Sequence, residues 1–343
     1  MDINNAFLNG FLKENVFMHQ PKGFINTNRP NHVCKLIKAI YGLKQAPRAW
    51  FDKLRSALLD WGFQNIKIDS SLFFLKDKNH ITFLMIYVDD IIIIGSNSKF
   101  VEAFIKQLNK TFAFKDLGKL HYFLGIEVSR DTRGMYLKQS KYISNLLKKF
   151  SMESSSSCPT PMITWKDFTA NSELMNNPSL FCKAIGALQY LTNTRPGITY
   201  SINKLSQYLS SPTVLHWQGL KRVLRYLQGT QNFYLHIKPT TDLDLTGFSN
   251  VDWATSLDDK KSIAGLYVYF GETLITWSSK KQKVVSRSST KFEYRALIDL
   301  AVEISWIKSL LQKIKLSIPR TPTLWCDNFS VKALASNLVM HAR

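Results

Sequence analysis

Two adjacent carboxylates, Asp89 and Asp90, lie between apolar runs rich in β-branched residues, within residues 81–95 (ITFLMIYVDDIIIIG). Such runs are typical of buried strands, and the two halves fit a β-hairpin with either Val88 and Asp89 or Asp89 and Asp90 at its tip. A carboxylate pair among isoleucines is costly unless a positive charge compensates it, and Mg²⁺ takes carboxylate and phosphate oxygens as ligands. The stretch therefore predicts either a metal-dependent phosphoryl-transfer site or a turn with two solvated side chains.

The net charge of the 343-residue chain is +20, which predicts a polyanionic partner, either nucleic acid or an anionic membrane surface. The chain is long enough for two or three domains, and its apolar content of 45% allows sizeable cores. Aromatic residues make up 13% of the chain, which argues against a disordered basic tail. The apolar run around Asp89 is too short, and too charged at its centre, to span a bilayer.

The cysteines are widely spaced and form neither a CxxC motif nor a cluster with histidines; they are Cys34, Cys158, Cys182 and Cys326. This spacing argues against a zinc site and favours a reducing compartment. Met1 is followed directly by Asp2 with no apolar stretch, so the sequence predicts no signal peptide.

The first half of the chain predicts the elements that hold the carboxylates in place. Asp2 ends a short strand, and residues 6–8 turn into a short helix. Residues 34–62 predict a strand, a turn and a helix with an apolar stripe that includes Trp50. The remaining elements are strands over 65–76 and 81–95, an amphipathic helix over 100–113 and a small β-unit over 114–140.

The second half begins with a helix over 141–150 and a linker, because residues 151–161 are rich in serine and proline. Residues 178–230 predict helices with breaks at 195–197 and 210–212. From residue 243 the predicted order is β-β-β-α-β-α, with strands at 243–252, 263–270, 273–278 and 322–326, a helix at 290–314 and a short helix from residue 330.

Three stretches resemble known motifs. Residues 87–90 (YVDD) resemble the YxDD motif of reverse transcriptases. Residues 1–24 (MDINNAFLNGFLKENVFMHQPKGF) and 39–50 (AIYGLKQAPRAW) look like the polymerase of copia-type retrotransposons, and the resemblance covers nearly the whole chain. It implies a region of a Pol polyprotein that carries out RNA-directed DNA polymerisation. The implied partners are an RNA template, a DNA primer and deoxynucleoside triphosphates, and the implied cofactor is Mg²⁺, as two ions.

The resemblance assigns the catalytic and metal-binding roles to Asp2, Asp89 and Asp90. Taken alone, Asp2 would be an exposed terminal residue. Phe7 corresponds to an aromatic steric gate, because a ring beneath the sugar leaves no room for a ribose 2′-hydroxyl. Taken alone, Phe7 would be a core residue.

Further roles in substrate binding follow from the same resemblance. Gly42, Lys44 and Gln45 match a motif that shapes the nucleotide and template pocket; taken alone, they would form a helix-entry loop. The primer grip is assigned to Phe123, Leu124 and Gly125. The last helix before residue 230 carries Lys221, Arg222 and Arg225 opposite an apolar face, which is either a solvated face or a surface that follows nucleic-acid phosphates.

The C-terminal part resembles the ribonuclease H fold but departs from its metal-binding pattern. The family reads S-D-A-D-W in the first strand, whereas residues 249–253 read SNVDW, so Asn250 replaces the first catalytic aspartate. Glu293 and Asp327 match two further acids, and the fourth would lie beyond Arg343. We therefore expect this half to be inactive, since an amide adds no negative charge to a site for divalent ions. A minor alternative is that Asp252 substitutes for Asn250.

The predicted fold class is α+β. Residues 1–150 are expected to form a polymerase palm without fingers and the start of a thumb, followed by a linker at 151–177. A helical thumb or connection is expected at 178–240, and a ribonuclease H-like α/β domain at 241–343. Both ends are expected to be truncated relative to the family.

Two alternatives to an active polymerase stay open at this point. The chain is either a catalytically dead, nucleic-acid-binding relic of such an element or a basic interaction protein in which the paired aspartates are incidental. The resemblance further implies a cytoplasmic location in a virus-like particle, or a nuclear one. It implies no membrane partner, and it implies association with other Pol and Gag products.

Overall fold

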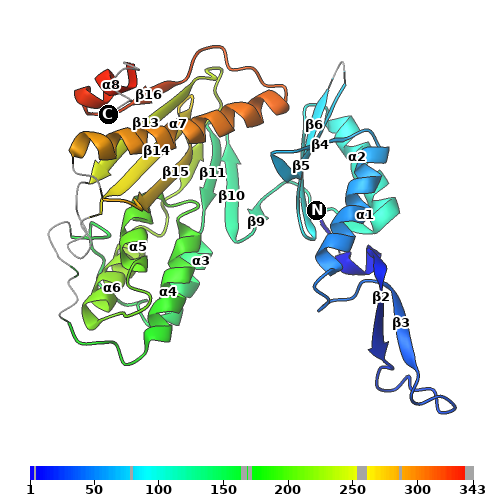
Figure 1. The fold of residues 1–343 in the computed structure, drawn as a ribbon. Coiled ribbons are helices and arrows are strands. Elements are labelled where there is room, and N and C mark those ends of the chain that lie inside the picture. Colours follow the sequence, from blue (N-terminus) through cyan, green and yellow to red (C-terminus); the bar gives the residue numbers. More distant parts are fainter. Residues whose placement is uncertain are drawn as a thin grey trace. The chain divides into compact units, whose positions relative to one another are not determined.

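The computed structural model describes residues 1–3, 5–77, 80–163, 168, 172–252, 261–285 and 288–336. These residues form two compact units, Met1–Leu120 and His121–Arg343, which are considered separately (Figure 1). Helices and antiparallel sheets occur in both units, in agreement with the predicted α+β class. The finer domain boundaries predicted from the sequence stay predictions, and part of the predicted linker lies outside the described residues.

The first unit is built on a six-stranded antiparallel sheet with the strand order β4-β5-β6-β7-β1-β8. Its central hairpin is the apolar stretch singled out above, and Tyr87 pairs with Asp90 across a turn of Val88 and Asp89. The strands are β1 (Asp2–Ile3), β4 (Gln64–Ile66), β5 (Asp69–Lys76), β6 (Ile81–Tyr87), β7 (Asp90–Gly95) and β8 (Phe114–Lys115).

Two helices, α1 (Ala46–Asp60) and α2 (Ser98–Phe112), build the core against one face of this sheet (Figure 1). Proline lies in the first turn of α1, and Gly62 follows its end with a φ of 88°, where a side chain would be strained. The Asn97 side chain caps α2 by accepting the Phe100 N–H. The buried core combines Trp50, Leu54 and Leu58 from α1, Phe104, Leu108 and Phe112 from α2, and Ile3, Leu84, Ile86 and Ile91 from the sheet.

A two-stranded hairpin, β2 (Phe11–His19) and β3 (Val33–Lys38), extends from the first unit (Figure 1). It follows the short 3₁₀ helix η1 (Ala6–Asn9), which was predicted. Sequence reasoning assigned no strand to residues 11–19, because their apolar side chains are interrupted by charged and polar ones. We call residues 11–38 the β2–β3 arm.

The second unit begins with a four-stranded sheet of order β12-β11-β10-β9 and a helical core. Its helices are interrupted at the predicted breaks, by η2 (Pro196–Ile198) and before Thr213, which caps α6 through a capping box. The elements are β9 (Tyr122–Phe123), β10 (Ile126–Asp131), β11 (Gly134–Lys138), β12 (Leu235–Ile237), α3 (Ser140–Lys149), α4 (Pro178–Leu191), α5 (Thr199–Ser206) and α6 (Val214–Gly229).

The rest of the second unit has the predicted β-β-β-α-β-α order and forms a sheet of order β15-β14-β13-β16. Helix α7 packs closely on β13, since a Cβ at Gly247 would lie 2.7 Å from side-chain atoms of Leu300 and Ile304. The elements are β13 (Leu245–Asp252), β14 (Ile263–Phe270), β15 (Thr273–Lys281), α7 (Ser289–Lys313), β16 (Thr323–Trp325) and α8 (Phe329–Ser336).

Within the described part of the chain, each helix falls short of the length and apolar character that a bilayer crossing requires. The four cysteines are free thiols.

Candidate active site

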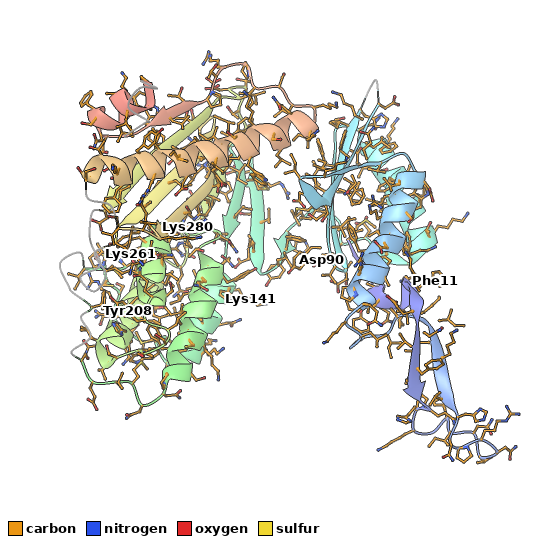
Figure 2. The ribbon with its side chains drawn as sticks, viewed as in Figure 1. Phe11, Asp90, Lys141, Tyr208, Lys261 and Lys280 are labelled. Carbon is orange, nitrogen blue, oxygen red and sulfur yellow. The ribbon has the colours of Figure 1, made fainter. Side chains whose placement is uncertain are left out.

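The predicted carboxylates meet in one row of side chains that crosses four strands. Asp90 pairs with Tyr87 on one side and with Asp2 on the other, and Asp2 pairs in turn with Lys115. Because register partners in a sheet point to the same face, these four side chains share a face. Figure 2 marks Asp90 at the start of β7.

This row lies on the open face of the sheet, opposite the helices. Side chains alternate between the two faces of a strand, and the neighbours Ile3 and Ile91 are buried in the core. Asp2 and Asp90 are half-buried, and Tyr87 and Lys115 are exposed. The alternation of side chains along β1 and β7 therefore places Asp2 and Asp90 on the open face while it buries Ile3 and Ile91.

The third carboxylate, Asp89, is held at the hairpin turn. Its carbonyl oxygen accepts a 3.2 Å hydrogen bond from the Ile3 N–H, which ties the turn to the strand that carries Asp2. The preceding residue, Val88, has a φ of 55°, a conformation that β-branched residues rarely adopt. The indole Nε1 of Trp50 donates a 2.6 Å hydrogen bond to the Val88 carbonyl oxygen, so α1 supports this strained turn.

The electrostatics of the row reflect an excess of negative charge. Burial raises the pKa of Asp90, and the charges of Asp89 and Asp2 raise it further, whereas the Met1 ammonium group lowers it. Two carboxylates are thus near enough to Asp90 to oppose its ionisation.

The donor set fits a divalent cation. The three carboxylates are hard oxygen ligands. Burial, followed by the charges of Asp89 and Asp2, raises the pKa of Asp90, and a bound cation would offset this cost of ionising the carboxyl group. Among the described residues, no group of three or more His, Cys, Asp and Glu side chains is already arranged as a metal cage. The aspartates are therefore neighbours in the sheet rather than a closed ligand shell.

Phe7 lies on η1, immediately before the β2–β3 arm. Its ring centroid lies 4.6 Å from that of Tyr41, and the half-buried ring also packs against the core of the first unit. The core interpretation and the gate interpretation therefore both remain compatible with its position.

The predicted nucleotide-pocket residues form the turn that leads into α1. Gly42 has a φ of 95°, which favours glycine, and no atom within 4 Å would meet a Cβ there. Lys44 is exposed, and Gln45 is the N-cap residue of α1 without a side-chain capping bond. The segment is a helix-entry loop with space around the Gly42 backbone and an exposed Lys44 side chain.

The predicted primer-grip residues belong to the second unit. Phe123 pairs with Ile126 across a two-residue turn of Leu124 and Gly125, whose φ angles are 47° and 75°. A Cβ at Gly125 would lie 3.0 Å from the Tyr190 hydroxyl, so this tight hairpin packs directly on α4.

The second unit also brings the ribonuclease H-like acids together. Asn250 and Asp327 line one cavity of about 370 Å³, together with Phe248, Tyr267 and Trp325. Burial raises the pKa of Glu293, and the charge of Asp327 raises it further. The Glu293 Oε2 atom is buried and has no hydrogen-bond partner in the described structure.

Asp252 has a protein partner. The hydroxyl group of Tyr200 on α5 donates a 3.0 Å hydrogen bond to Asp252 Oδ2. Burial and the Asp252 charge raise the pKa of Tyr200, so its proton stays on the hydroxyl group. This bond holds the Asp252 carboxylate toward α5.

The basic residues of α6 make contacts within the protein. Arg222 Nη2 donates to Thr160 Oγ1 at 2.7 Å, and Arg225 Nε donates to the Ser156 carbonyl at 2.7 Å. Both arginines thereby hold the serine-rich segment against the helix. The Lys221 ammonium group lies 5.8 Å from the Trp217 ring centroid.

Comparison with known proteins places these motifs in a family. Residues 1–164 match the family described as reverse transcriptase (RNA-dependent DNA polymerase). The chain is 45% identical over its full length to the retrovirus-related Pol polyprotein from transposon RE1 of Arabidopsis thaliana, and 33% identical to that from transposon TNT 1-94 of Nicotiana tabacum. It is 30% identical to a putative transposon Ty5-1 protein of Saccharomyces cerevisiae, all of which it covers.

The chain belongs to the reverse transcriptase family of copia-type retrotransposon Pol polyproteins. It spans 24% of the length of the RE1 polyprotein and 26% of the TNT 1-94 polyprotein, and 89% of the chain aligns with the Ty5-1 protein.

Sequence reasoning missed three residues that shape this reverse transcriptase region. Trp50 was assigned to the core only, although its indole N–H supports the turn that carries Asp89. Lys115 was not singled out, although the sheet places it beside Asp2. Gly10 was overlooked, yet a Cβ there would lie 2.7 Å from the Trp50 backbone nitrogen. The only sequence signal for Gly10 was a glycine directly after the predicted short helix.

Proposed function

We propose that this chain is an RNA-directed DNA polymerase region that extends a DNA primer on an RNA template with deoxynucleoside triphosphates. The observation that carries the proposal is the pairing of Asp2 with Asp90 beside the Asp89 turn, on the open face of the sheet. Phosphoryl transfer needs carboxylates gathered at one point of a substrate-accessible surface, and this row provides them.

Asp2, Asp89 and Asp90 would hold two Mg²⁺ ions. When bound, these ions would supply electrostatic stabilisation of the attacking and leaving oxygens of the transfer. The carboxylates of the chain bring the negative charge that makes a dicationic site favourable beside polyanionic substrates. The Trp50 hydrogen bond fixes the backbone from which Asp89 projects.

The remaining site residues would orient the substrates. Phe7 would lie beneath the sugar and exclude a 2′-hydroxyl, and Lys44 would contact the triphosphate or the template backbone. Gly42 and Gln45 would shape that pocket. The hairpin of Phe123, Leu124 and Gly125 would grip the primer end, and positioning of this kind supplies much of the rate.

The proposed architecture follows the same logic. The six-stranded sheet with α1 and α2 would be a polymerase palm, the α4–α6 helices a thumb or connection, and the β13–β16 sheet with α7 a ribonuclease H-like domain. In that last domain Asn250 stands where the first acid is expected, so we propose no hydrolysis of RNA there. The Lys221 side of α6 would face nucleic-acid phosphates, while Arg222 and Arg225 retain their contacts with the serine-rich segment.

Primer extension on a primed RNA template with Mg²⁺ tests the proposal. Extension is expected for the chain and is expected to be abolished by Asp89→Asn, which removes one ligand charge. The matched control is Asp60→Asn, which removes an exposed carboxylate at the end of α1 and should extend primers normally. Binding of the primed template without any extension would instead support the catalytically dead, nucleic-acid-binding alternative.

A further inference from the structure

The β2–β3 arm exposes large apolar side chains along its whole length. Phe17 is 58% exposed, Ile37 71% and Phe24 at the tip 82%. The base of the arm packs on α1 near Phe11, which Figure 2 marks where β2 leaves the rest of the unit. Several large apolar side chains exposed on one small element indicate an interaction surface.

The tip of the arm is an ordered loop. The Gln20 side-chain amide donates to the carbonyl oxygens of Arg29 and His32, both at 2.9 Å, and its Oε1 accepts the Asn26 N–H at 2.8 Å. One glutamine thus closes residues 20–32 into a fixed shape. Phe24 is presented from this loop, and its own N–H bonds to the Pro21 carbonyl at 3.0 Å.

Cations accompany the aromatic rings of the arm. Residues 11–38 contain one acidic residue, Glu14, and five basic ones, which gives a net charge of +4; the basic residues are Lys13, Lys22, Arg29, Lys35 and Lys38. Phe17 pairs with Lys35 across the strands, and Phe11 pairs with Lys38. The Lys38 ammonium group lies 5.8 Å from the Phe11 ring centroid. Each of these rings therefore has a cation beside it on the same face.

We propose that the β2–β3 arm binds single-stranded nucleic acid, with unpaired bases stacked on Phe17 and Phe24 and phosphates contacted by Lys22 and Lys35. Alternating rings and cations match a strand that offers one flat face and one negative charge per nucleotide. A purely apolar protein partner would leave the +4 charge uncompensated. This binding goes beyond the proposed polymerase function, since it requires neither the carboxylates nor a metal ion.

The experiment measures the affinity of the full chain for a labelled, unstructured RNA oligonucleotide in the presence of EDTA. Phe24→Leu keeps the apolar surface but removes the ring, and we expect it to weaken binding about fivefold or more, while Phe24→Tyr binds like the wild type. The matched control is Phe329→Leu, which alters a 90% exposed phenylalanine on α8 and should leave affinity unchanged. Since Phe24 projects into solvent, none of these substitutions should disturb folding.

A salt titration tests the charge component. Lys35→Gln should reduce the slope of log affinity against log salt by about 0.7, the value for one phosphate contact to a single strand. Lys106→Gln, an equal charge loss on the exposed side of α2, should leave the slope unchanged.

The outcomes distinguish this proposal from an apolar protein interface and from the polymerase proposal. Equal RNA affinity of the wild type, Phe24→Leu and Phe17→Leu would overturn it. If the protein instead self-associates, and this self-association persists in both Leu variants but is lost in Phe17→Ala, the arm is an apolar protein interface. The same measurements in an Asp89→Asn background should give the same arm effects. If the unaltered chain does not extend primers but the arm substitutions still weaken RNA binding, the polymerase proposal is refuted and the arm proposal stands.

Discussion

The buried indole of Trp50 on α1 donates a 2.6 Å hydrogen bond to the carbonyl oxygen of Val88, the residue with a φ of 55° at the tip of the central hairpin. A non-glycine residue in this conformation costs on the order of 1–3 kcal/mol and persists only where its surroundings hold it. Trp50 is 1% exposed and packs edge-on against Phe112. The position of Asp89 is therefore coupled to the packing of a helix that carries none of the carboxylates.

Trp50→Phe should expose this coupling, because it keeps an aromatic ring but removes the indole N–H. We expect the free energy of unfolding to fall by about 1–3 kcal/mol, the cost of leaving a polar group unpaired. In primer extension kcat should fall more than the nucleotide KM changes, because the substitution disturbs the carboxylate geometry rather than substrate binding. Trp61→Phe, at the C-cap of the same helix, is the control and should preserve kcat. A Trp50→Phe protein with lower stability but unchanged kcat would restrict Trp50 to a packing role.

The pKa of Asp90 gives a prediction about stability and pH. Burial and the charges of Asp89 and Asp2 raise this pKa above the ordinary 3.8, so the folded state binds the proton more tightly than the unfolded state. The stability that this protonation contributes is present at low pH and is lost as the pH rises through the folded-state pKa. The side chain introduced by Asp90→Asn cannot ionise, so this substitution should raise the Tm relative to the wild type at neutral pH.

Thermal denaturation across a pH series measures this difference. The Tm advantage of Asp90→Asn over the wild type should shrink as the pH falls below the Asp90 pKa. An advantage that grows toward low pH would mean that Asp90 is stabilised, not opposed, in its charged form.

The ribonuclease H-like sheet should not hydrolyse the RNA strand of an RNA–DNA hybrid in Mg²⁺. Asn250 contributes no charge, and Tyr200 holds Asp252 by a 3.0 Å hydrogen bond. Asn250→Asp alone should not restore cleavage, and neither should Tyr200→Phe, which removes the hydrogen bond from Tyr200 to Asp252. Cleavage by the unaltered chain that disappears in Glu293→Gln would show that the acid assignments are wrong, with Asp252 as the first residue to re-examine.

Gly10→Ala should destabilise the first unit. A Cβ at this position would lie 2.7 Å from the Trp50 backbone nitrogen and 2.8 Å from the Ala49 carbonyl carbon, and neither backbone atom can move without shifting α1. We expect a loss of about 1–3 kcal/mol in the free energy of unfolding, as for other overpacked sites. The control is Gly186→Ala on α4, where no atom apart from the adjacent residues and the helix's own backbone lies within 4 Å of the new Cβ. That helical substitution should stabilise by about 0.5–1 kcal/mol.

Chemical denaturation of both variants gives the two free energies directly. If Gly10→Ala is as stable as the wild type, the contact between η1 and α1 is looser than the structure indicates.

Much of the local structure was predictable because it depends on residue type and spacing. The apolar runs around Asp89 and Asp90 predicted the central hairpin, and the stripe from Trp50 to Leu58 predicted a helix with a buried face. The order of elements from β13 to α8 was also predicted from the sequence. The β2–β3 arm was not predictable from the sequence. Its apolar side chains are exposed, so no buried face requires them to alternate with polar ones along the strands.

The sequence by itself determined which residues could do chemistry: the paired aspartates, an aspartate at residue 2, and an amide where a ribonuclease H acid is expected. The family resemblance implied that Asp2 and Asp90 lie together, but the tertiary structure alone decided that these residues, 88 positions apart, pair directly in the sheet with Lys115 as the other neighbour of Asp2. The tertiary structure also decided that the Asp252 carboxylate accepts a hydrogen bond from the Tyr200 hydroxyl group. Pairing between distant strands is set by the burial of a whole sheet face, and no local pattern in the chain records which carboxylate will face which partner.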